Sequence, residues 1–109
     1  MSYILDAACL CNTGKVRKNN EDNFFFDGRC LEADNNGLKH PVTMTKDLWR
    51  EICVAIFDGM GGESFGELAS FAAADCMQNT TRRLKDYFIP EKKFLNRMCM
   101  KLNEAVVIK

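Results

Sequence analysis

The chain lacks an excess of charge of either sign, since 15 basic and 15 acidic side chains cancel over 109 residues. This balance argues against nucleic acid as the main partner, because a phosphate backbone selects for a basic face. No apolar run approaches the roughly twenty residues of a transmembrane helix. The N-terminus also lacks a basic segment followed by a long apolar stretch, so no secretory signal is expected. We therefore expect a cytoplasmic protein with no membrane partner, forming one small domain or part of one.

The chain also lacks the cysteine spacing of a metal or redox motif. Its six cysteines stand at positions 9, 11, 30, 53, 76 and 99, and no two of them form a C-x-x-C pair. A zinc site is therefore disfavoured. Without a secretory signal, we expect reduced thiols, several of them buried as small apolar groups.

Apolar patterning predicts three strands in the first half of the chain. Their ranges are Tyr3–Cys11, Asn23–Asp27 and Ile52–Phe57. The last is a continuous apolar run, which is typical of a strand buried on both faces. The intervening segment Gly28–Arg50 is polar and irregular, contains the turn signal Asp34–Gly37, and is either a hairpin or an excursion.

Two helices are expected in the second half. Ser64 can cap the first, with Glu67 three residues on as a capping box. Helical spacing predicts a buried stripe at Phe65, Leu68, Ala69, Ala72, Cys76 and Met77. Pro90 suits the start of the second helix, whose stripe is Phe94, Leu95, Met98, Leu102, Ala105 and Val106. The helical pattern is still running at Lys109, so we expect a truncated domain.

The stretch VAIFDGMGGESFGE, residues 54–67, combines a strand end with four glycines. It fails the dinucleotide fingerprint because Ser64 stands where a glycine is needed, and it fails the P-loop pattern because Glu67 replaces the lysine. Asp58 at the end of an apolar strand instead needs a cation or a helix N-terminus as its partner. Glycines from Gly59 onward would let backbone carbonyls reach a hard cation, and Mg²⁺ and Mn²⁺ prefer oxygen ligands.

A second polar stretch, GKVRKNNED at residues 14–22, precedes the phenylalanine-rich strand. Taken alone, its acids and arginine would be a solvated turn. The spacing G-x-x-R-x-x-N-E-D, followed about 36 residues later by D-G-M-G-G and then by G-E-x-A-S, resembles the metal-dependent protein serine/threonine phosphatases (PPM, or type 2C) of the bacterial kind. The resemblance implies an α+β fold. Residues 1–109 would be the N-terminal part of a layered α/β/β/α sandwich of antiparallel sheets flanked by helices.

The resemblance also implies roles for individual residues. Asp58 would bridge two Mn²⁺ or Mg²⁺ ions, and Gly59 would offer its carbonyl to one of them. Glu21 would hold metal-bound water, and Asp22 would support the site. Arg17 would bind the substrate phosphate, which suits a bidentate guanidinium. A metal-activated water would then hydrolyse phosphoserine or phosphothreonine in a protein substrate, with no cysteine nucleophile.

The chain departs from the family pattern at several points. Glu63 stands where many bacterial members have histidine, and His40, the only histidine, is expected at the surface. The later family motifs that supply further metal aspartates are missing. We therefore expect the fragment to be inactive alone and to need the C-terminal half of the domain or a swapped copy. Two other hypotheses stay open: a non-catalytic phosphatase-like binding or regulatory module, and a small α+β domain with a glycine-rich turn.

Overall fold

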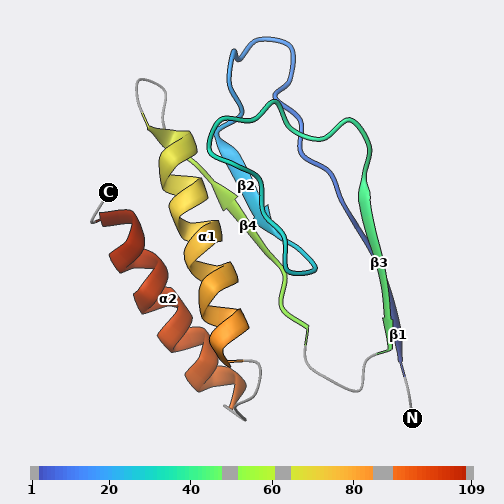
Figure 1. Cartoon of the computed structure of the whole chain (residues 1–109), viewed down its shortest axis with the longest axis vertical. Coiled ribbons are helices and arrows are strands. Elements are labelled where there is room, and N and C mark those ends of the chain that lie inside the picture. The colour runs from blue at the N-terminus through green and yellow to red at the C-terminus, as the bar shows by residue number, and fades with distance from the viewer. Residues whose placement is uncertain (1–2, 48–51, 61–64, 85–89, 108–109) are drawn as a thin grey trace.

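A computed structural model describes residues 3–47, 52–60, 65–84 and 90–107. It is an α+β arrangement of four strands followed by two helices (Figure 1). The elements are β1 (Ile4–Cys9), β2 (Asp22–Phe25), β3 (Val42–Asp47), β4 (Ala55–Asp58), α1 (Gly66–Leu84) and α2 (Glu91–Val107). The strands form two antiparallel pairs, β1 with β3 and β2 with β4.

Three consecutive phenylalanines hold the layers of the fold together. Successive side chains of a strand point to opposite faces, so Phe24 and Phe26 share one face and Phe25 takes the other. Phe24 and Phe26 pack with Met44 of β3 and with apolar residues of β1. Phe25 packs with Met77 of α1 and Met98 of α2. The β2–β4 pair therefore lies between the β1–β3 pair and the two helices, as Figure 1 shows.

The helices α1 and α2 pack against each other, and some of the side chains that they bury differ from those expected from the sequence. In α1 the buried apolar residues are Ala72, Ala73, Ala74 and Met77. Phe65 and Leu68 are exposed, so that part of the predicted stripe is wrong. In α2 Met98 is buried, but Leu95 is 56% exposed. The α2 start agrees with its signal, because the carbonyl of Pro90 accepts the first helical hydrogen bond, from the amide of Phe94 at 2.9 Å.

The prediction that residues 52–57 are buried on both faces is wrong. In β4 the burial alternates, and Ile56 is 84% exposed although its register partner Phe24 on β2 is only 5% exposed. The two side chains lie on the same face of the pair. The β1–β3 layer therefore covers that face at β2 and leaves it open at β4. A continuous apolar run could not reveal which of its faces would be covered.

The polar segment Gly28–Arg50 contains a strand that its composition concealed. Within it, β3 pairs with β1 along all six residues, from Val42 opposite Cys9 to Asp47 opposite Ile4. Only Val42 and Met44 supply apolar side chains to this layer, so the period-2 signal is short. The strands predicted at Tyr3–Cys11 and Asn23–Asp27 are confirmed as β1 and β2. β1 is shorter than predicted, and β2 begins one residue earlier, at Asp22, and ends at Phe25.

The cysteines, the histidine and the helices can also be compared with what the sequence predicted. All six cysteines are free, but none is fully buried, so the prediction of several buried thiols is wrong. His40 is exposed, as expected. In the ranges that the structure describes, neither helix has the length and apolar character needed to cross a bilayer. Ser64, Glu63 and Lys109, to which the sequence gave meaning, lie outside those ranges, as do Gly61 and Gly62.

The shared core of Phe25, Met77 and Met98 predicts a clear stability difference between two methionines of α2. Met98→Ala should lower the free energy of unfolding by about 2–5 kcal/mol, because it leaves a cavity at a side chain that is 4% exposed. Met100→Ala, at a side chain that is 66% exposed, should change it by less than about 0.5 kcal/mol. Urea denaturation followed by circular dichroism measures both, and equal losses would contradict this core assignment.

Candidate functional site

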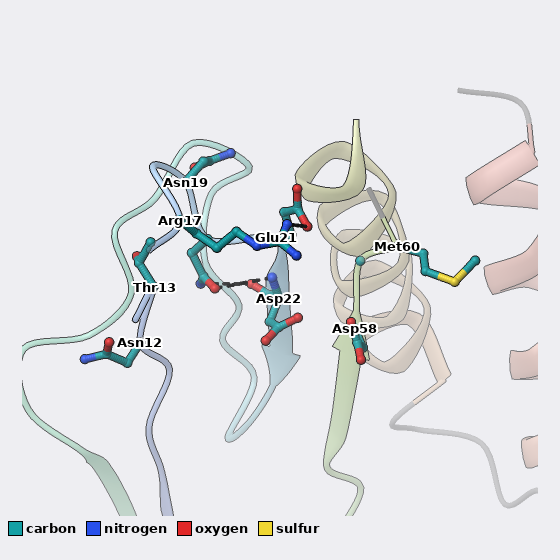
Figure 2. A pocket seen from close by; sticks show the side chains of 10 residues that line it. Asn12, Thr13, Arg17, Asn19, Glu21, Asp22, Asp58 and Met60 are labelled. Atoms are coloured by element: carbon teal, nitrogen blue, oxygen red, sulfur yellow. Dashed lines mark hydrogen bonds and ion pairs between the residues drawn. The ribbon is translucent and has the colours of Figure 1, made fainter. Parts of the chain in front are cut away.

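The pairing of β2 with β4 brings together two acids that are far apart in the sequence. Asp22 opens β2 and Asp58 closes β4, and the antiparallel register places them opposite each other. Cross-strand partners have their side chains on the same face, so two like charges are neighbours there. Figure 2 shows both carboxyl groups at this end of the two strands. The structure thus unites the two acids that the separate motifs singled out.

The neighbourhood of Asp22 disfavours its ionised form. The pKa of Asp22 is raised, first by modest desolvation, although the residue as a whole is exposed, and then by the charge of Asp58 and a carboxyl–carboxyl hydrogen bond with it. The charge of Glu21 adds a smaller effect. A backbone hydrogen bond at Gly59 acts in the opposite direction. Two carboxylates held side by side gain from anything positive placed between them. The pair therefore favours either a shared proton or a bound cation.

Gly59 is required by close backbone packing. A Cβ at this position would overlap the carbonyl oxygens of Glu21 and Gly66, so only glycine fits. The residue is buried, and its φ is not in the left-handed region. What approaches this backbone is therefore the chain itself: the turn before β2 and the start of α1. The predicted role of the Gly59 carbonyl as a metal ligand stays a prediction.

Arg17 and Glu21 contact each other directly. The Nη1 atom of Arg17 lies 3.0 Å from Oε2 of Glu21, and the dashed line in Figure 2 marks this bond. The Arg17 side chain is 61% exposed, so the pair is partly solvated and weak. The sequence assigned the two residues to different ligands, phosphate and metal-bound water. In the structure each of them partly neutralises the other.

All five residues proposed from the sequence line one cavity of about 610 Å³. Figure 2 shows Asp22 and Asp58 at the ends of β2 and β4, with Arg17 reaching toward Glu21 beside them. Gly59 also lines the cavity. Sequence reasoning missed the other lining residues, which are Asn12, Thr13, Asn19, Asn20 and Met60. Of these, Asn20 had a usable signal, because it directly precedes the two acids of its motif.

The donor set is smaller than a two-metal centre needs. Among residues 3–47, 52–60, 65–84 and 90–107, no group of three or more His, Cys, Asp or Glu side chains is arranged to hold a metal ion. The Asp22–Asp58 pair remains, and Mg²⁺ is commonly bound through one or two carboxylates together with waters and substrate phosphate. The residues present therefore suit a weak, partly hydrated Mg²⁺ or Mn²⁺ site.

Comparison with known proteins adds no assignment. No protein-family model, curated protein or solved structure matches the chain significantly. The site therefore has to be judged on its own geometry and chemistry.

The acid pair predicts a stability gain when one charge is removed. Because the pKa of Asp22 is raised in the folded protein, its ionisation destabilises the fold as pH rises above the ordinary value of 3.8. Asp22→Asn should therefore raise the melting temperature of the metal-free protein at pH 7, and the difference should disappear near pH 3. Thermal melts at both pH values check this.

Asp47→Asn, which removes an exposed carboxylate at the end of β3, is the matched control and should have little effect. A lower melting temperature for Asp22→Asn at pH 7 would contradict the unfavourable interaction between the Asp22 and Asp58 carboxylates.

Proposed function

We propose that this chain is part of a metal-dependent protein serine/threonine phosphatase of the PPM type, bacterial kind. The observation that carries the proposal is the convergence of Arg17, Glu21, Asp22, Asp58 and Gly59 on one cavity. These residues come from two motifs, which the β2–β4 pairing brings together. The layered order of helices, the β2–β4 pair and the β1–β3 pair is compatible with the N-terminal part of an α/β/β/α sandwich.

In the proposed chemistry, the two aspartates and Arg17 would bind different parts of the reacting complex. Asp58 and Asp22 would hold the cation, whose charge would relieve the repulsion between them. When bound, Mn²⁺ or Mg²⁺ would supply Lewis-acid activation of a water. Arg17 orients the phosphate of a phosphoserine or phosphothreonine and offsets its charge. Glu21 holds the guanidinium at the rim until phosphate competes for it.

A two-metal site would need ligands beyond those that the described residues supply. Because two paired carboxylates are too few for a two-metal centre, further ligands would come from the C-terminal half of such a domain or from a swapped copy. The open face of β4 supports this, since Val54 and Ile56 line an apolar cavity of about 370 Å³ together with Cys9 of β1. Further strands of a sandwich would cover these side chains. We expect the 109-residue chain alone to bind metal weakly and to show no turnover.

A second candidate function is a non-catalytic phosphatase-like module that binds or regulates partners. It is favoured by the small donor set of the described residues. It predicts binding of a phosphopeptide without hydrolysis, even when a complementary half is supplied. The retention of Arg17, Glu21, Asp22 and Asp58 around one cavity favours the enzyme.

Metal binding is the direct test on the chain as it stands. Mn²⁺ titration followed by electron paramagnetic resonance should show a site in the wild type that is lost in Asp58→Asn and kept in the control Asp47→Asn.

In a complete domain that contains these residues, Asp58→Asn should abolish Mn²⁺-dependent hydrolysis of a phosphopeptide. Chelation should silence the wild type and added Mn²⁺ should restore it. Near wild-type hydrolysis by Asp58→Asn would contradict the role of Asp58 as a metal ligand.

Arg17 gives an independent test of the phosphate subsite. In the complete domain, Arg17→Ala should raise KM for a phosphopeptide roughly tenfold, because a hydrogen bond to a charged group is lost. Lys18→Ala removes a neighbouring exposed positive charge and should change KM little. Steady-state kinetics at fixed Mn²⁺ separates the two variants. Equal changes would mean that general charge around the cavity, and not the Arg17 guanidinium, attracts the substrate.

A further inference from the structure

Asn20 is a polar residue almost completely buried beside the cavity, with only 4% of its surface exposed. Burying a carboxamide is costly unless its donors and acceptor are bonded. The Asn20 side chain has such partners in three segments: Cys11 just after β1, Asp22 at the start of β2, and Asn35 in the following turn. A buried side chain with this many partners has little freedom to move, so it can fix whatever it contacts.

The Asn20 side chain binds both backbone groups of Asp22. Its Nδ2 donates to the Asp22 carbonyl at 3.1 Å, and its Oδ1 accepts from the Asp22 amide at 3.3 Å. The carboxamide thus bonds Asp22 in the way that a neighbouring strand would, at the residue where β2 begins. Since the backbone of Asp22 is held there, its carboxylate is held opposite Asp58.

Asn35 holds Asn20 in turn. Its Oδ1 accepts from Nδ2 of Asn20 at 2.8 Å, and its backbone carbonyl accepts from the Asn20 amide at 3.4 Å. The turn around Asn35 is itself fixed. The Asn35 side chain donates to the carbonyl of Glu32 and accepts from the amide of Gly37. Gly37 adopts φ +81° against the segment just after β1, where a side chain would overlap the carbonyl of Cys11. The turn around Asn35, in the polar segment after β2, therefore holds Asn20 in place just before Asp22.

We propose that Asn20, braced by Asn35, is the positioning residue of the acid pair: it sets where the Asp22 carboxylate stands relative to Asp58. This inference rests on the proposed function, because the pair matters as a cation site only if the chain binds one. Groups that orient metal ligands without touching the metal typically change metal affinity by about 10–100-fold when removed.

Asn23 provides a matched control. It is 2% exposed, and both polar atoms of its side chain are bonded: Nδ2 donates to the carbonyl of Leu31 at 2.8 Å, and Oδ1 accepts from the amide of Leu31 at 2.9 Å. It has the same side chain, similar burial and a similar number of bonds, yet it holds Leu31 and does not line the cavity. Asn20→Ala and Asn23→Ala should therefore lose similar amounts of stability.

Two measurements on the 109-residue chain test the proposal. Mn²⁺ titration should show affinity about 10–100-fold weaker for Asn20→Ala and less than about threefold weaker for Asn23→Ala. Amide hydrogen exchange should show faster exchange at Asp22 in Asn20→Ala only, because its amide loses its acceptor. Equal effects of both alanine variants on Mn²⁺ affinity would overturn the inference and leave the proposed function standing.

Asn35→Ala keeps the direct bonds between Asn20 and Asp22, so it is the milder variant to use if Asn20→Ala does not fold. It should weaken Mn²⁺ binding in the same direction by a smaller factor and speed exchange at Asp22; no change in either would overturn the inference. If the wild type binds no Mn²⁺ at all, the proposed function fails, and exchange at Asp22 in these variants alone then decides whether Asn20 positions it.

Discussion

The pairing of β2 with β4 is the constraint on which the rest of the structure depends. It carries Phe24 and Phe25, whose side chains reach the two sides of the core, and it ends in two opposed aspartates. The apolar side chains stabilise the pairing strongly enough to hold like charges together at its end. Without that burial, Asp22 and Asp58 would separate, because each is more favourably placed in water than beside the other.

The segments around the pair keep this end of the sheet rigid. On one side Gly59 lets the turn after β4 approach the carbonyls of Glu21 and Gly66. On the other side Asn20 bonds the backbone of Asp22. A cation site gains from such rigidity, since ligands that are already in place lose little entropy on binding. The acid pair is thus tied to Gly59 and Asn20 by direct contacts, with the half-buried Glu21 and the exposed Arg17 beside it.

Much of the candidate site could be predicted from local sequence. Arg17, Glu21, Asp22, Asp58 and Gly59 stand in two short motifs, and all of them line the cavity. The remaining residues could not be found in this way. Thr13 and Met60 carry no chemical signal of their own, and the bracing role of Asn35 depends on a turn meeting Asn20 from 15 residues away.

The fold shows the same division. Local patterning located β1, β2, β4 and both helices, because each has its own apolar pattern. It missed β3, whose polar residues form a strand only because β1 supplies the partner. It also misjudged Ile56, since exposure depends on which layer covers a face.

Sequence pattern alone was enough to predict three of the four strands, both helices and the two motifs of charged residues. It could not show that Asp22 faces Asp58, that Arg17 contacts Glu21, or that the polar excursion contacts Asn20. Register and packing arise from contacts between distant segments, and no local pattern encodes them.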